Sequence, residues 1–174
     1  ADLGTGGRPC RIALLDRVAF EPDKAPFHAQ PERYDPRVSA LTQASKALFS
    51  ELGIWRHIAD MRQCPYDKMQ VWDAEGTGSI QFRAHEVHQS DLGSIVENSV
   101  ISSALHQGLS EQSNLTYFAP FNLTSVKRDA SDTLLIGSED GSAVRAKLLV
   151  AADGANSRIR QLAGFATREW DYGH

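Results

Sequence analysis

An apolar run that ends at an Asp-Gly pair constrains the fold of this sequence more than any other feature. Residues 147–160 are KLLVAADGANSRIR, a pattern that predicts a buried strand, a tight turn and then a helix. Gly154 permits a turn conformation that a β-carbon disfavours. Because open α/β folds bind ligands at the carboxyl ends of their strands, the pattern predicts that Asp153 is held at the mouth of a sheet.

Ser157 and Arg160 follow the Asp-Gly pair at helical spacing, as D-G-x-x-S-x-x-R. Two interpretations are open. The two side chains can bind a phosphate or lock Asp153, and they can equally form an ordinary capped turn with an arginine at the surface. For any single residue the capped turn is the better interpretation, whereas the whole motif after a buried strand favours a ligand site.

A second acid, Asp16, ends a second short apolar run, RIALLDR, at residues 11–17. A carboxylate at the end of a buried parallel strand is the usual acceptor for an adenosine ribose, although Asp16 can equally cap the following turn. In dinucleotide-binding folds this acid lies about 20 residues after a glycine fingerprint. Only 15 residues precede Asp16, and GTGG at residues 4–7 lacks the spacing G-x-G-x-x-G, so we expect this chain to be a fragment without the fingerprint strand.

The remaining pattern predicts an α/β fold with antiparallel β insertions. The Pro-rich residues 21–36 predict a long excursion without regular structure. Residues 39–53 and 94–112 have the periodicity of amphipathic helices, and Gly53 is a suitable C-terminal stop. Short strands are predicted as a hairpin in residues 69–86 and in residues 115–123, 126–129, 132–138 and 143–153, before a last helix at 157–163.

Composition and charge argue against several classes of protein. The 174 residues are 41% hydrophobic, which is enough for a core, and the formal net charge of −4 argues against a nucleic-acid binder, since such a protein needs a basic face. Two cysteines form neither a disulfide framework nor a zinc site, so a reducing compartment is expected. No apolar run approaches the ~20 residues that span a bilayer, and residues 1–10 lack the apolar core of a signal peptide.

Metal and nucleophile sites find little support in the sequence. HEVH at residues 85–88 carries two histidines, but it is not H-E-x-x-H and is expected to be solvated. Cys10 and Cys64 have no histidine arrangement beside them, and no G-x-S-x-G elbow occurs. We therefore predict no metal ligand and no catalytic side chain in this chain.

Several motifs taken together resemble a known family. The Asp-Gly motif, DPRVSALTQASKALFSELGIW, VENSV and WDYGH resemble the flavin-dependent aromatic hydroxylases of ubiquinone biosynthesis, which are class A flavoprotein monooxygenases related to p-hydroxybenzoate hydroxylase. The resemblance extends over residues 11–174. PYDKMQVWD and WDYGH are most similar to the branch that hydroxylates polyprenylated phenols, such as 2-polyprenylphenol.

The resemblance implies cofactor contacts at matching positions. Asp16 matches the acid that binds the adenosine ribose of FAD, and Arg37 matches the arginine that lies along the FAD pyrophosphate and near the isoalloxazine. Asn98, in VENSV, matches approximately a polar helix residue that contacts FAD.

The Asp-Gly motif has an implied role as well. Asp153 and Gly154 match the motif that helps bind FAD and is implicated in NAD(P)H use, and Ser157 and Arg160 are expected to support it. The implied fold is a partial FAD/NAD(P)-binding fold of the Rossmann-like, p-hydroxybenzoate hydroxylase-like kind. Its FAD-binding part is expected in residues 1–68 and 95–165, and part of a substrate-domain sheet in residues 69–94 and 166–174.

The implied activity is the hydroxylation of the aromatic ring of a polyprenylated phenol, with FAD as cofactor and NAD(P)H and O₂ as co-substrates. A cytoplasmic location is implied, with peripheral contact with the inner membrane and with other ubiquinone-biosynthesis proteins as open alternatives. We expect the fragment alone to be inactive. A truncated relative that binds partners without carrying FAD, and a different nucleotide-binding enzyme such as a dehydrogenase, remain as alternative functions.

Overall fold

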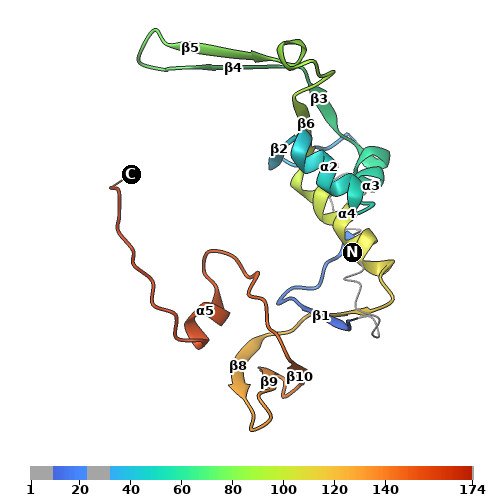
Figure 1. The fold of residues 1–174 in the computed structure, drawn as a ribbon, viewed down its shortest axis with the longest axis vertical. Coiled ribbons are helices and arrows are strands. Elements are labelled where there is room, and N and C mark those ends of the chain that lie inside the picture. The colour runs from blue at the N-terminus through green and yellow to red at the C-terminus, as the bar shows by residue number, and fades with distance from the viewer. Residues whose placement is uncertain (1–9, 23–31, 174) are drawn as a thin grey trace. The chain divides into compact units, whose positions relative to one another are not determined.

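The computed structural model describes residues 10–22 and 32–173 (Figure 1). It divides the chain into two compact units. One comprises residues 1–19 and 114–174, and the other comprises residues 20–113. Most of the Pro-rich segment, residues 23–31, lies outside the described residues.

The unit of residues 20–113 contains a three-stranded antiparallel sheet in the order β2-β6-β3. These strands are β2 (Val38–Thr42), β3 (Cys64–Tyr66) and β6 (Gly93–Glu97). The central strand, β6, is almost entirely buried, as expected for a strand with a neighbour on each edge. Val38 pairs with Glu97, which brings the residue before β2 next to the first residue after β6.

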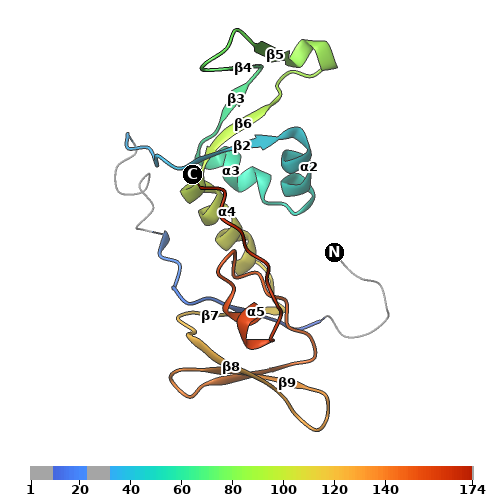
Figure 2. The ribbon, with the colours of Figure 1, turned by 90° about the vertical axis from the view of Figure 1, so that its left-hand side faces the viewer.

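Three helices belong to the same unit (Figure 2). They are α2 (Gln43–Glu51), α3 (Trp55–Met61) and α4 (Asn98–Ser110). Helices α3 and α4, strand β6 and the residue before α3 form a core whose buried members are Ile54, Ile58, Val96, Val100 and Ala104. Gly108 lets α4 approach this core closely, because a β-carbon there would collide with the Cδ1 atom of Ile54.

Both predicted helices of this unit begin later than the sequence pattern suggested. Residues 39–42 and 94–97 are strands that pair with each other, so the predicted helices over 39–53 and 94–112 are wrong in their first turns. The Oγ1 atom of Thr42 accepts a hydrogen bond from the amide of Ser45 and starts α2 at the next residue. Gly53 ends this region at a φ of +72°, as predicted for a C-terminal stop. Helix α3 was not predicted.

The predicted hairpin is present as β4 (Lys68–Trp72) and β5 (Ser79–Arg83), followed by the 3₁₀ helix η2 (Ala84–Val87). The pairs Met69–Phe82 and Val71–Ile80 place four apolar side chains on one face. All four are exposed or half-exposed, since the hairpin extends away from the helices of its unit (Figures 1 and 2).

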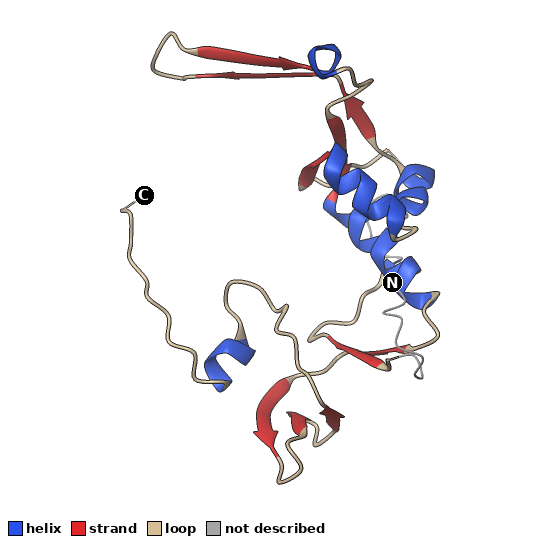
Figure 3. Cartoon of the chain, in the orientation of Figure 1, coloured by secondary structure: helices blue, strands red, loops and turns tan. Residues whose placement is uncertain are grey.

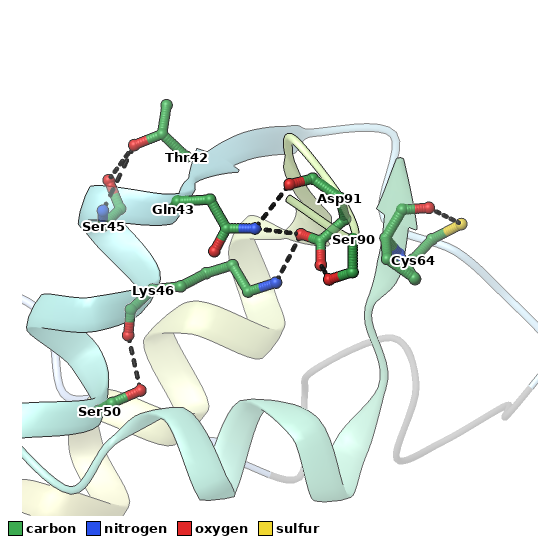
Figure 4. A network of polar contacts seen from close by, with 9 residues as sticks. Thr42, Gln43, Ser45, Lys46, Ser50, Cys64, Ser90 and Asp91 are labelled. Atoms are coloured by element: carbon green, nitrogen blue, oxygen red, sulfur yellow. Dashed lines mark hydrogen bonds and ion pairs between the residues drawn. The ribbon is translucent and has the colours of Figure 1, made fainter. Parts of the chain in front are cut away.

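A polar network joins α2 to the segment that follows the hairpin (Figure 4). The carboxylate of Asp91 accepts hydrogen bonds from the Nζ atom of Lys46 at 2.8 Å and from the Nε2 atom of Gln43 at 2.7 Å. The hydroxyl of Ser90 donates to the second carboxylate oxygen at 3.0 Å. The network therefore holds the residues just before β6 against α2.

This network predicts a pH dependence of stability. The bond from Lys46 is the main cause that lowers the pKa of Asp91 below its ordinary value. The stabilisation is therefore fully present above the ordinary carboxyl pKa and is lost as the pH falls through the lowered value of the folded state. We expect Asp91→Asn to lose less stability than the wild type over this acid range, measured by urea unfolding at several pH values. Asp60→Asn, at an exposed position of α3, is the control and should follow the wild type. If Asp91→Asn lost as much stability as the wild type over this acid range, the prediction would be contradicted.

The other unit contains a parallel pair and an antiparallel meander. Strands β1 (Ile12–Leu15) and β7 (Leu115–Phe118) are parallel, as predicted for the run that ends at Asp16. The prediction that this strand is buried is wrong in this structure, because Ile12 is 48% exposed and Leu14 and Leu15 are only half-buried. The antiparallel meander consists of β8 (Leu123–Arg128), β9 (Leu134–Ser138) and β10 (Ala143–Ala146), in the order β10-β9-β8. The sequence predicts short strands here at residues 126–129, 132–138 and 143–153. The short helix α5 (Arg158–Leu162) follows.

The predicted apolar strand before the Asp-Gly motif does not form in this structure. Strand β10 ends at Ala146, and residues 147–152 are irregular (Figure 3). The side chains of Leu148 and Val150 are 76% and 72% exposed. Among the described residues no strand pairs with this segment, so its backbone lacks the ladder of hydrogen bonds that would make it a strand. Asp153 is therefore not at the end of a strand here, contrary to the prediction.

Within the described ranges, no helix is both long enough and apolar enough to cross a bilayer.

Candidate functional site

Two of the predicted cofactor residues lie in one hollow of the unit of residues 20–113. This hollow, called the Arg37 hollow below, has a volume of about 500 Å³. It lies between the segment that enters β2 and the first turns of α4. Its lining residues are Asp35, Arg37, Ser39, Asn98, Ser99, Ile101 and Ser102.

Local hydrogen bonds hold Arg37 and Asn98 together. The amide of Asn98 donates to the carbonyl of Arg37 at 2.9 Å, and the hydroxyl of Ser39 donates to the Oδ1 atom of Asn98 at 2.6 Å. The amide of Arg37 donates to the Oδ1 atom of Asp35 at 2.9 Å. This last bond is the main cause that lowers the pKa of Asp35, so its carboxylate stays ionised at neutral pH.

The donor groups around the Arg37 hollow suit a phosphate. A guanidinium provides paired charged donors, and the first amides of a helix carry partial positive charge. Helix α4 has 13 residues, and its N-cap residue makes no side-chain capping bond. The side-chain NH₂ group of Asn98 and the hydroxyl of Ser102 add neutral donors, whereas the hydroxyl of Ser39 and the backbone amide of Asn98 are already used in the bonds described above. The residues present therefore fit the pyrophosphate of a dinucleotide such as FAD.

The Asp-Gly motif lines a second hollow, in the other unit. This hollow, called the Asp153 hollow below, has a volume of about 320 Å³. Gly154 has a φ of +81°, the left-handed conformation that the turn requires. The lining residues are Ala151, Asp153, Gly154, Ser157, Ile159, Arg160 and Phe165.

The polar groups of the motif bind one another. The hydroxyl of Ser157 donates to the Oδ1 atom of Asp153 at 2.6 Å, and the amides of Arg158 and Ile159 donate to its Oδ2 atom at 2.7 and 3.2 Å. The bond from Ser157 is the main cause that lowers the pKa of Asp153. The Nη2 atom of Arg160 donates to the carbonyl of Ala155 at 2.6 Å. In this structure the motif therefore locks the aspartate and caps α5, as both sequence interpretations allowed.

Ser157 is the N-cap of α5, and its removal should be measurable. Its Oγ atom accepts a hydrogen bond from the amide of Arg160 at 3.0 Å, and the residue is 6% exposed. We expect Ser157→Ala to cost about 1 kcal/mol in the stability of α5 and to speed hydrogen exchange of the Arg160 amide about fivefold. Ser142→Ala is the matched control, because the hydroxyl of Ser142 also donates to an aspartate, Asp140, but caps no helix. Equal exchange in Ser157→Ala and the wild type would contradict this role.

Asp16 lies directly after β1, at the edge that the sequence predicted. Its amide donates to the carbonyl of Phe118 at 3.0 Å, and its carbonyl accepts from the amide of Phe121 at 2.7 Å. The Oδ1 atom of Asp16 accepts from the amide of Val18 at 3.1 Å. The side chain is exposed and makes the turn-capping bond that was the alternative interpretation, and this bond leaves its Oδ2 atom available to a ligand hydroxyl.

Sequence reasoning missed a part-buried ion pair beside the Arg37 hollow. Glu97 is 6% exposed and pairs with Arg62, whose Nε atom lies 2.5 Å from the Oε1 atom of Glu97. The one sign of this pair in the sequence is that Glu97 belongs to the motif VENSV. The resemblance assigns a cofactor contact to Asn98 of that motif and none to Glu97.

In the part of the chain that the structure describes, no group of three or more histidine, cysteine or acidic side chains is arranged to hold a metal ion. His85 lies in η2, and His88 follows it at a φ of +55°.

Curated relatives include a demethoxyubiquinol hydroxylase and ubiquinone biosynthesis monooxygenases. The chain is 37% identical over 150 residues to the 3-demethoxyubiquinol 3-hydroxylase of Escherichia coli (strain K12). The alignment covers 86% of this chain and 38% of that relative. The chain is also 37% identical over 153 residues to the mitochondrial ubiquinone biosynthesis monooxygenase COQ6 of Homo sapiens. This alignment covers 81% of this chain and 31% of that relative. The chain thus spans about a third of the length of these relatives.

Solved structures show the fold. A mutant of PqsL from P. aeruginosa matches with a TM-score of 0.68 at 16% identity, over 93% of this chain and 41% of that chain. The p-nitrophenol 4-monooxygenase PnpA from Pseudomonas putida DLL-E4 matches with a TM-score of 0.63 at 17% identity, over 88% of this chain and 37% of that chain. Together with the family match given next, these structures confirm the predicted fold class, a partial FAD-binding fold with mixed helices and strands.

The profile of one family, described as the FAD binding domain, matches residues 28–172. This range contains the Arg37 hollow and the Asp153 hollow. Together with the relatives, the match confirms the resemblance to the FAD-dependent hydroxylases of ubiquinone biosynthesis. The chain belongs to the FAD binding domain family.

Proposed function

We propose that this chain forms part of the FAD site of a monooxygenase that hydroxylates the aromatic ring of a polyprenylated phenol in ubiquinone biosynthesis, with NAD(P)H and O₂ as co-substrates. The observation that carries the proposal is the convergence of Arg37 and Asn98 on one hollow at the N-terminus of α4. The names of the relatives, a 3-demethoxyubiquinol hydroxylase and a ubiquinone biosynthesis monooxygenase, support the pathway and the reaction class.

The proposed roles follow from the donor and acceptor groups. The guanidinium of Arg37 binds the pyrophosphate of FAD at the N-terminal end of α4, and Asn98 orients the cofactor through its side-chain amide. Asp16 accepts hydrogen bonds from the adenosine ribose. Asp153 and Gly154 contact the cofactor as well, in a turn that the bond from Ser157 to Asp153 and the bond from Arg160 to the carbonyl of Ala155 hold.

The chemistry of the ring belongs to the cofactor, because bound FAD supplies the reaction with O₂ and the transfer of oxygen. The residues of this chain bind and orient FAD. We place the substrate side in residues 69–94 and 166–174, and the exposed apolar face of β4 and β5 supports this placement, since a polyprenyl chain is apolar.

A flavin titration tests the proposal. The chain is titrated against FAD and against riboflavin, with flavin fluorescence as the signal. Because the Arg37 hollow has donors for a pyrophosphate, FAD should bind at least about 10-fold more tightly than riboflavin, which lacks one. A chain that binds neither flavin at millimolar concentration would contradict the proposal and favour the partner-binding alternative. Equal affinity would contradict the role of the hollow.

A further inference from the structure

Glu97 links the end of β6 to the segment that carries Arg37. It is the last residue of β6 and the N-cap residue of α4, and it is buried at 6% exposure. A buried carboxylate costs free energy unless charged and polar partners surround it. The donors that bond to the carboxylate of Glu97 therefore indicate which segments of the chain it holds in place.

The carboxylate of Glu97 accepts hydrogen bonds from two directions. The Nε and Nη2 atoms of Arg62 donate to Oε1 and Oε2 at 2.5 and 2.9 Å, as a fork. The amide of Asp35 donates to Oε2 at 2.6 Å. One side chain thus connects the residue after α3 with a backbone amide two positions before Arg37.

Arg62 holds the same segment at a second point. Its Nη2 atom also donates to the carbonyl of Arg33 at 2.7 Å, and its guanidinium carbon lies 4.4 Å from the ring centre of Tyr34. The backbone of residues 33–35 is therefore bound at both ends. From Asp35 the fixation continues to the amide of Arg37, which donates to the Oδ1 atom of Asp35 at 2.9 Å.

We infer that Glu97, together with Arg62, is a positioning residue that fixes the backbone of residues 33–37 and so aims Arg37 at its ligand; this inference rests on the proposed role of Arg37 toward FAD. Neither side chain lines the Arg37 hollow, so neither acts by touching the cofactor there. The segment has no regular structure before β2, and without the clamp its residues would regain conformational freedom that binding must then remove.

Glu97→Gln tests the clamp without changing its shape. Two oxygens of Glu97 receive three N–H groups, whereas a glutamine offers one oxygen and one NH₂ group. With its oxygen at the Oε1 position, the NH₂ group faces both the amide of Asp35 and the Nη2 atom of Arg62. With its oxygen at Oε2, the NH₂ group faces the Nε atom of Arg62. In either orientation the NH₂ group of the glutamine faces an N–H donor from which the carboxylate of Glu97 accepts a hydrogen bond. The hold on the segment is therefore weaker than in the wild type.

Two measurements are made on the whole chain. Amide hydrogen exchange of Arg37, recorded without flavin, should be at least about 10-fold faster in Glu97→Gln than in the wild type. The dissociation constant of FAD should rise about 10-fold. In an Arg37→Ala background Glu97→Gln should change that constant by less than about twofold, because the clamp acts through Arg37.

Glu111→Gln is the matched control. Glu111 is the C-cap residue at the other end of α4, and its carboxylate oxygens accept two bonds from Arg56, at 3.2 and 3.0 Å. That pair is exposed and lies outside the Arg37 hollow. Glu111→Gln should leave both the exchange of Arg37 and the affinity for FAD unchanged.

Several outcomes would overturn the inference. Unchanged exchange of Arg37 in folded Glu97→Gln would do so, and so would an equal loss of FAD affinity in the Arg37→Ala background, which would indicate general destabilisation. If the wild type bound no FAD, the proposed function would fail, while the exchange measurement would still decide whether Glu97 fixes the segment. If Glu97→Gln did not fold, Arg62→Lys takes its place, because lysine keeps the charge but not the two parallel hydrogen bonds of arginine. It should give the same faster exchange of the Arg37 amide. Unchanged exchange in Arg62→Lys would again overturn the inference.

Discussion

Replacing Arg37 with Ala is expected to raise the dissociation constant of FAD by about 10- to 100-fold. The expected size follows from the loss of charge-assisted hydrogen bonds, worth about 1.5–3 kcal/mol, to the pyrophosphate. Arg37→Lys should lie between Ala and the wild type, because an ammonium keeps the charge but not the paired donors. Flavin fluorescence in a titration at constant ionic strength measures the change.

The specificity of this effect can be checked in two ways. Riboflavin, which has no phosphate, should bind Arg37→Ala and the wild type equally. Arg56→Ala removes another exposed arginine of the same unit, one that pairs with Glu111 outside the Arg37 hollow, and should leave the affinity for FAD unchanged. An equal loss of FAD affinity in Arg56→Ala would mean that net charge, and not the hollow, attracts the cofactor.

The largest loss of stability is expected for Ile58→Ala. The side chain of Ile58 is 0% exposed and packs in the core formed by α3, β6 and α4. Its truncation removes apolar contacts and leaves a cavity between elements that other contacts hold in place, so the free energy of unfolding should fall by about 3 kcal/mol. Urea unfolding followed by tryptophan fluorescence measures this change.

Leu48→Ala is the matched control for this prediction. Leu48 lies on α2 of the same unit and is 54% exposed, so its truncation should cost less than about 1 kcal/mol. Equal losses in the two variants would show that α3 does not pack against β6 and α4 in solution as it does in the structure.

The predictions from sequence succeeded where a short stretch of chain contains all the groups that define its conformation. The turn at Gly154, the cap of α5 by Ser157 and the stop at Gly53 each depend on residues a few positions apart. The meander of β8, β9 and β10 is of the same kind, because its turns bring neighbouring strands together.

The errors concern residues whose conformation depends on a distant partner. Val38–Thr42 and Gly93–Glu97 carry patterns compatible with helix, and they become strands because they pair with each other across the chain. Residues 147–152 have the pattern of a buried strand, but no strand among the described residues pairs with them. The pairing of Glu97 with Arg62 likewise joins residues 35 positions apart, and neither residue type announces it.

The sequence alone determined the family, the Asp-Gly motif and the identity of the proposed cofactor residues, because these depend on residue types at fixed spacing. Only the tertiary structure decided that Arg37 and Asn98 share one hollow and that Glu97 and Arg62 clamp the segment before it. The physical reason is that strand pairing and buried ion pairs gain their free energy from contacts made after the chain has folded back on itself, and a local pattern carries no record of which distant groups will meet.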